Sequence, residues 1–219
     1  YIMLNSTKKL KKEINKLDSV EEILESLKDK YVGKTACIVA PGPTLKEHDL
    51  KELKSVLGRE DVVVLSIKQA YDWVQEETDF HIMNTWNWDK FNGYDYVDEN
   101  TIVFFGLTKA YVEAQMEKIA VKPSVCDFWI PVSSAPYHSE AETIQATRDY
   151  DLFYQLGTEL ESRWGKSILY EQAIPLALHI GCKDMFTIGW DIGTPTPDGN
   201  IGHAYSYDKL KPIPAQPDD

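Results

Sequence analysis

A short loop between two predicted elements is the first part of this sequence whose residues could do chemistry. Residues 40–44, Ala-Pro-Gly-Pro-Thr, follow a uniformly apolar run and precede leucines at helical spacing. A loop that opens a helix directs backbone N–H groups and the positive end of the helix dipole at whatever lies there. We therefore predict that Gly42, Pro43 and Thr44 bind a nucleotide, although the pattern is neither GxGxxG nor a Walker loop. The alternative is a simple turn stiffened by proline.

Polar residues also follow the second and third predicted strands. Lys68 and Gln69 come after the second strand, and Asn84 ends the third. Open parallel sheets bind ligands outside the carboxyl ends of their strands, so we expect these residues to contact a nucleotide or donor. Trp86 and Trp88 could stack on a base or a sugar. The alternatives are a solvated lysine, an asparagine that caps a turn, and tryptophans that pack.

His203 is the candidate general base. It lies in the polar sequence Gly-His-Ala-Tyr at 202–205, and histidine can accept a proton from an attacking hydroxyl near neutral pH. The alternative is a surface histidine in a loop. Asp191, Asp198 and His203 could together bind a divalent metal, but their irregular spacing matches no common site. We therefore expect no metal.

The elements that position these residues are predicted by hydrophobic periodicity. Apolar runs that predict strands lie at 36–40, 62–65, 79–84, 101–106, 125–132 and 184–189, and helical patterns lie at 20–31, 44–57, 69–75, 109–119 and 167–180. Strands that alternate with helices predict an α/β fold with a Rossmann-like, mostly parallel sheet flanked by helices. Thr44 and Glu47 have the spacing of a capping box, Pro175 could kink the last helix, and Gly181 is expected to stop it.

The domain organisation follows from the same reading. We expect a peripheral helical segment at 1–32 and one Rossmann-like catalytic domain at 33–219, with a candidate lid or small insertion at about 133–157. The chain of 219 residues starts at Tyr1 and ends in two aspartates, which suggests that the natural chain continues in both directions.

Composition limits the classes of partner. With 23 basic and 35 acidic residues, the net charge of -12 repels polyanions, so nucleic acid is not an expected partner. The three cysteines are far apart, which favours buried free thiols in a reducing compartment. No apolar stretch is long enough to span a membrane. We expect a soluble cytoplasmic protein, with the membrane surface as the alternative location; an oligomer is compatible with the sequence.

The sequence at 38–45, Ile-Val-Ala-Pro-Gly-Pro-Thr-Leu, is similar to the glycine-proline-serine loop of the bacterial sialyltransferases of the Campylobacter type, which resemble glycosyltransferase family 42. It also resembles the related DUF115 domain of motility accessory factors. Asn84, Ser167, the turn at 181–184 that leads to Ile-Gly-Trp-Asp at 188–191, and Gly-His at 202–203 follow in the family's order. The likeness covers residues 35–110 and 165–208.

The resemblance implies a Rossmann-like glycosyltransferase that uses a nucleotide-sugar donor linked to CMP and a saccharide acceptor, with no required metal or other cofactor. By position, Gly42, Pro43 and Thr44 would hold the nucleotide, Asn84 the donor, Ser167 the base or phosphate region, and His203 the acceptor hydroxyl. We add Lys68 and Gln69, from their place after the second strand, and Gly189 and Asp191 to the predicted nucleotide and donor site. A sialic or related acidic sugar is the expected donor sugar.

Three departures from the family leave other functions open. Pro41 replaces the family's usual asparagine, no tyrosine lies between 190 and 202, and the chain ends soon after His203, where the family continues with a helix and strand. Tyr205 and Tyr207 could substitute for the missing tyrosines. One alternative is an enzyme like the DUF115-type 6-hydroxymethylpterin pyrophosphokinases, in which Asp191 would bind magnesium with ATP. The other is a nucleotide-binding protein without catalysis.

Overall fold

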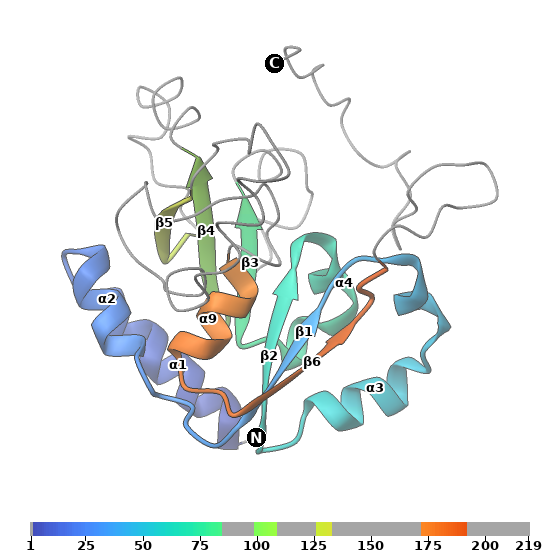
Figure 1. The fold of residues 1–219 in the computed structure, drawn as a ribbon. Helices are drawn as coiled ribbons and strands as arrows, with labels where there is room; N and C mark the ends of the chain where they lie inside the picture. The colour runs from blue at the N-terminus through green and yellow to red at the C-terminus, as the bar shows by residue number, and fades with distance from the viewer. Residues whose placement is uncertain (1, 85–98, 109–125, 133–171, 192–219) are drawn as a thin grey trace, which may run out of the picture.

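The computed structural model describes residues 2–84, 99–108, 126–132 and 172–191 (Figure 1). Several sequence predictions lie outside these residues: the helix at 109–119, the candidate lid at about 133–157, and the site residues Ser167 and His203. Trp86, Trp88 and Asp198 also lie outside them.

The described strands form one six-stranded sheet in the order β5-β4-β3-β2-β1-β6, and every neighbouring pair is parallel. The strands are β1 (Thr35–Val39), β2 (Val62–Ile67), β3 (Phe80–Asn84), β4 (Ile102–Thr108), β5 (Phe128–Val132) and β6 (Asp184–Ile188). Each contains most of a predicted apolar run. The predicted α/β class and Rossmann-like parallel sheet are therefore confirmed.

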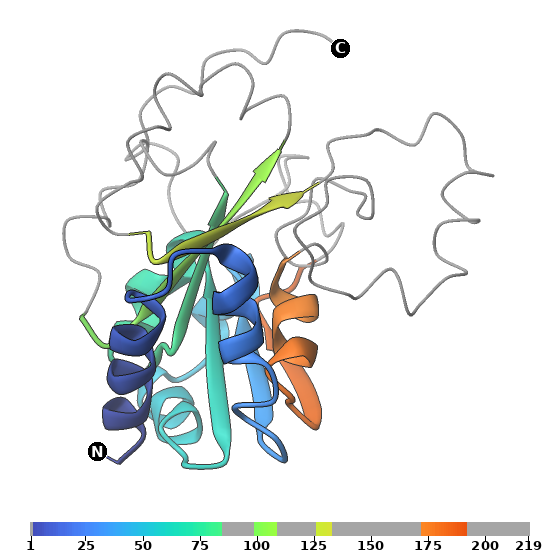
Figure 2. The ribbon, with the colours of Figure 1, turned by 90° about the vertical axis from the view of Figure 1, so that its left-hand side faces the viewer.

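Helices cover both faces of the sheet (Figures 1 and 2). On one face lie α1 (Ile2–Ile14), α2 (Val20–Leu27) and α9 (Ile174–His179), whose apolar side chains join one core cluster. On the other face lie η1 (Pro43–Glu47), α3 (Leu50–Leu57), η2 (Lys68–Ala70) and α4 (Tyr71–Val74), which contribute to the second cluster. The turn η3 (Gln75–Glu77) leads into β3. Burial on both faces explains why the central strands are uniformly apolar.

The N-terminal helices are part of the core, which is a closer association than the peripheral position that we expected. Ile14 and Leu27 are fully buried in the first core cluster. The lysines and glutamates lie on the outer surface of an amphipathic pair of helices, and Ser19 caps α2 by accepting a hydrogen bond from Glu22 N. A lysine-rich amphipathic helix is thus compatible with a buried inner face, because only its other face meets solvent.

Two buried aspartates attach α1 to the amino-terminal edge of the sheet. Asp79, just before β3, accepts a hydrogen bond from the Thr7 hydroxyl, and Asp127, just before β5, accepts one of 2.7 Å from Asn15 Nδ2. Lys11 Nζ lies 3.0 Å from the Asp127 carboxylate. Each aspartate also accepts a backbone N–H from the neighbouring strand, so the two carboxylates connect helix and sheet at the edge opposite the strand ends predicted to bind ligand.

One local prediction about helix ends was wrong, and one is confirmed. Thr44 does not form a capping box: the chain makes a short 3-10 turn at η1, and α3 starts afresh with Asp49 as its N-cap. Pro175 lies near the start of α9, directly after the π-helical residues 172–173, and the predicted helix before them, at 167–171, lies outside the described residues. Gly181 ends α9 with a φ of 87°, a conformation that favours glycine.

Cys37, Cys126 and Cys182 are buried thiols that form no disulfide, as the sequence predicted. No helix within the described ranges is both long and apolar enough to cross a membrane.

Candidate functional site

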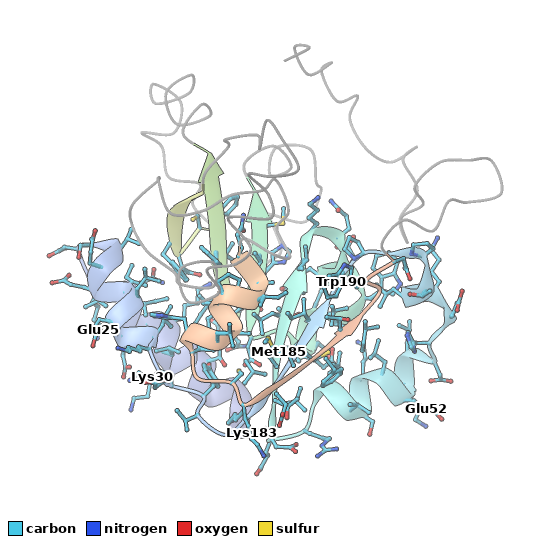
Figure 3. All side chains as sticks on the ribbon, viewed as in Figure 1. Glu25, Lys30, Glu52, Lys183, Met185 and Trp190 are labelled. Atoms are coloured by element: carbon cyan, nitrogen blue, oxygen red, sulfur yellow. The ribbon has the colours of Figure 1, made fainter. Side chains whose placement is uncertain are left out.

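The loops that follow β1 and β6 lie side by side at the carboxyl-terminal edge of the sheet. The two strands are adjacent and in register, with Val39 opposite Ile188. The pairing continues past their ends, because Ala40 N donates to Ile188 O at 2.8 Å and Gly42 N donates to Gly189 O at 2.8 Å. Figure 3 labels Trp190, which follows this pairing at the carboxyl end of β6, and Lys183 at its amino end.

Asp191 and Thr44 close this junction. Thr44 N donates to Asp191 Oδ2 at 2.9 Å, and the Thr44 hydroxyl donates to Asp191 Oδ1 at 2.6 Å. Both residues are half-buried. The carboxylate thus accepts from an N–H in the first turn of η1, the position where an anion commonly binds at the start of a helix.

Two glycines allow the loops to approach this closely. A Cβ on Gly42 would lie 2.1 Å from Asp191 Oδ2 and 2.3 Å from Gly189 O. Gly189 has a φ of 69°, and a Cβ there would lie 2.1 Å from Ala40 O. The small size of Gly42 therefore admits a second loop of the same chain.

The junction uses all the backbone donors of the loop after β1. Pro41 and Pro43 have no N–H, the N–H groups of residues 40, 42 and 44 bond to the β6 side, and Leu45 N donates to Gly42 O at 3.1 Å. A phosphate could therefore bind these amides only by displacing Asp191 or Gly189. A nucleotide was predicted to contact residues 42–44, Gly189 and Asp191, and these contacts stay predictions. The geometry limits them to contacts that leave the pairing of the two loops intact.

A second group of polar residues lies at the same edge, at the end of β2. Lys68 begins η2 with a φ of 49°, a left-handed conformation that is uncommon for a residue other than glycine. Burial lowers the pKa of its ammonium group, because desolvation disfavours the charged form. Lys68 has no ion-pair partner among the described residues.

Gln69 follows Lys68 and is only 7% exposed, yet neither Oε1 nor Nε2 has a hydrogen-bond partner among the described residues. Buried side-chain amides in native proteins almost always have one. Asn84 ends β3, where its Cα pairs with Gly106 of β4. Because β2 and β3 are parallel neighbours, the structure brings the backbone positions predicted after these two strands to one edge.

A buried polar pair that the sequence analysis did not single out lies on the α4 face of β2 and β3. Ser66 Oγ and His81 Nδ1 are 3.2 Å apart, and the Tyr71 ring lies 4.5 Å from that of His81 between centroids. Burial lowers the pKa of His81 to about 3, so the imidazole is neutral near pH 7. The only sequence signal was a histidine at an inward position of an otherwise apolar strand.

These observations define the class of the fold as a Rossmann-like α/β sheet with paired loops and buried polar groups at its carboxyl edge. Within the described part of the chain, no group of three or more histidine, cysteine or acidic residues is arranged to hold a metal ion. No protein-family model matches the sequence, and no curated protein matches it. Since this fold hosts many unrelated functions, function must be inferred from the residues of the site.

Proposed function

We propose that this protein is a glycosyltransferase that transfers a sugar, a sialic or related acidic sugar, from a CMP-linked donor to a saccharide acceptor. The observation that supports it most is the junction of two sequence motifs. The loop at 40–44 and the sequence at 188–191 both carry the resemblance to the sialyltransferase family. They are joined by the hydrogen bonds between Thr44 and Asp191, residues 147 positions apart.

The position of this junction agrees with nucleotide binding. It lies at the carboxyl ends of β1 and β6, beside the ends of β2 and β3, which is where sheets of this kind bind ligands. The chain is acidic overall, so a nucleotide phosphate needs a local cation, and Lys68 is a cation at this edge.

The proposed reaction requires two kinds of group. Cleavage of the bond between the sugar and the phosphate passes through a state like an oxocarbenium ion, so the departing phosphate must be stabilised by hydrogen-bond donors or cations. The acceptor hydroxyl must lose a proton as it attacks the anomeric carbon. We assign this proton to His203, because an imidazole side chain can act as a general base near neutral pH.

The first test is a thermal-shift screen of the purified protein with CMP, CDP, UDP, GDP and ATP, each with and without magnesium. A ligand that binds only the folded state stabilises it by roughly 2.7 kcal/mol at a hundredfold excess over its Kd. Stabilisation by CMP without metal is the expected result. A response to ATP that requires magnesium would indicate the pyrophosphokinase alternative.

The second test addresses catalysis. His203→Ala is expected to lose transfer of sugar from the CMP-linked donor while CMP binding is kept. His48→Ala is the matched control, because His48 is an exposed histidine. Turnover by His203→Ala at the wild-type rate would contradict the role of this residue. CMP binding by the wild-type protein without turnover of any donor would instead indicate a nucleotide-binding protein that lacks catalysis.

A further inference from the structure

The two polar regions at the carboxyl edge of the sheet differ in what they can still bind. The loop after β1 has internal partners for each N–H from residue 40 to residue 45, and it faces the carboxylate of Asp191. That carboxylate repels a phosphate. An anionic ligand at this edge of the sheet is therefore expected to bind away from the loop after β1.

The end of β2 carries two polar groups that have no partner among the described residues. Lys68 is half-buried and has no counter-ion among them, an arrangement that the binding of an anion would stabilise. Its left-handed φ of 49° adds backbone strain. Strained backbone of this kind is held in place by the surrounding structure and is concentrated at functional sites.

Gln69 supplies the second observation, and it is independent of the charge on Lys68. The residue is only 7% exposed, and neither Oε1 nor Nε2 has a hydrogen-bond partner in the described part of the chain. The amide offers one acceptor and two donors. A ligand that satisfies it must present a donor and an acceptor side by side, as nucleobases do, or a hydroxyl next to a phosphate oxygen.

The described residues around η2 supply no competing partner for this amide. The turn η2 follows β2 directly and lies against β2 and β3 (Figure 1). The nearby His81 is neutral and has its Nδ1 beside the Ser66 hydroxyl. The uncompensated positive charge and the unsatisfied amide are therefore adjacent along the chain at one end of β2.

We propose that Lys68 and Gln69 form the anchoring site for the phosphate-bearing ligand, with the Lys68 ammonium on the phosphate and the Gln69 amide on the adjoining polar group. In this arrangement the loop after β1 shapes the edge of the site but donates no backbone N–H to the phosphate. The identification of the ligand as a nucleotide rests on the proposed function. The location of the anion does not.

The experiment compares variants of Lys68 in calorimetric titrations with CMP, cytidine, inorganic phosphate and pyrophosphate. Lys68→Gly removes the cation and suits the left-handed φ, so the variant is expected to fold with a Tm no lower than that of the wild type. Asp29→Gly is the matched control: Asp29 has a φ of 57°, so this change relieves similar strain but lies in the turn after α2. Gln69→Leu tests the role of the amide, because it replaces the amide with an apolar side chain of similar size.

We expect CMP to bind the wild type and Asp29→Gly equally, and cytidine to bind much more weakly. Lys68→Gly should bind CMP roughly tenfold to a hundredfold more weakly, the range for loss of a hydrogen bond to a charged group. Gln69→Leu should also bind more weakly while its unliganded Tm rises, because an unsatisfied polar group is removed.

The remaining outcomes separate this site from the proposed function. Equal CMP affinity in Lys68→Gly and the wild type would overturn the site and leave the glycosyltransferase proposal standing. Binding of phosphate or pyrophosphate that requires Lys68, with no binding of any nucleotide, would support the site and contradict the proposed function. A wild-type protein that binds none of the four probes would overturn the site.

Discussion

The close contact of the loops after β1 and β6 makes a specific prediction for Gly42→Ala. The new Cβ would lie 2.1 Å from Asp191 Oδ2 and 2.3 Å from Gly189 O, whereas ordinary contacts begin at 3.4 Å. The carboxylate can rotate away, but the backbone carbonyl of Gly189 cannot. The two loops must therefore separate by about 1 Å.

The magnitude follows from the hydrogen bonds that this separation breaks. Gly42 N loses its 2.8 Å bond to Gly189 O, and Asp191 loses its bonds from Thr44 N and the Thr44 hydroxyl. A backbone bond contributes about 1 kcal/mol and a bond to a charged group about 1.5 kcal/mol or more, but Thr44 and Asp191 are only half-buried, so water partly replaces their partners. We expect the free energy of unfolding to fall by about 3 kcal/mol.

The assay is urea unfolding followed by circular dichroism, with Gly58→Ala as the control. Gly58 has a φ of -76°, and a Cβ there would have Lys54 O at 3.2 Å as its nearest neighbour. Its replacement should change the free energy of unfolding by less than about 1 kcal/mol. If Gly42→Ala were no more destabilised than Gly58→Ala, the inferred packing of the two loops would be wrong.

Two further predictions concern buried titratable groups. Burial raises the pKa of Asp79 to about 6 from its ordinary value of 3.8, so between these values the folded state binds more protons than the unfolded chain. Stability from this group is present below its ordinary pKa and is lost as pH rises through about 6, by about 3 kcal/mol in total. Urea unfolding at several pH values should show this loss in the wild type relative to Asp79→Asn, and parallel pH profiles would contradict it. Burial also raises the pKa of Cys37 and of Cys182 to about 12. A thiol reagent near pH 8 should therefore label both cysteines slowly in the native protein and rapidly only in urea. Fast labelling of the native protein would show that these thiols are not buried.

The sheet was predictable because its residues carry a local signal. Strands covered on both faces must be apolar throughout, so runs such as the Val-Val-Val-Leu sequence at 62–65 indicate buried strands without knowledge of their neighbours. The positions of Lys68, Gln69 and Asn84 were predictable for a related reason. Parallel strands end at one edge, so residues that follow them lie together.

Properties that depend on distant residues were not predictable. The Thr44 hydroxyl has the local spacing of a capping box, but it bonds to Asp191, and only the pairing of β1 with β6 makes that partner available. Periodicity predicted a helix at 20–31, but a stripe of apolar residues does not say which surface it covers. The backbone φ of Lys68 and the unpartnered amide of Gln69 likewise depend on the packing around η2.

The sequence by itself thus determined the class of fold, the order of the strands along the chain and the edge at which polar residues gather, because these follow from periodicity and from the geometry of parallel strands. Only the tertiary structure decided which polar residues at that edge bond to one another and which have no described partner. It joins Gly42 and Thr44 to Gly189 and Asp191, and it leaves Lys68 and Gln69 without described partners. The physical reason is that hydrogen-bond partners far apart in the chain are chosen by strand pairing, which short-range sequence patterns do not encode.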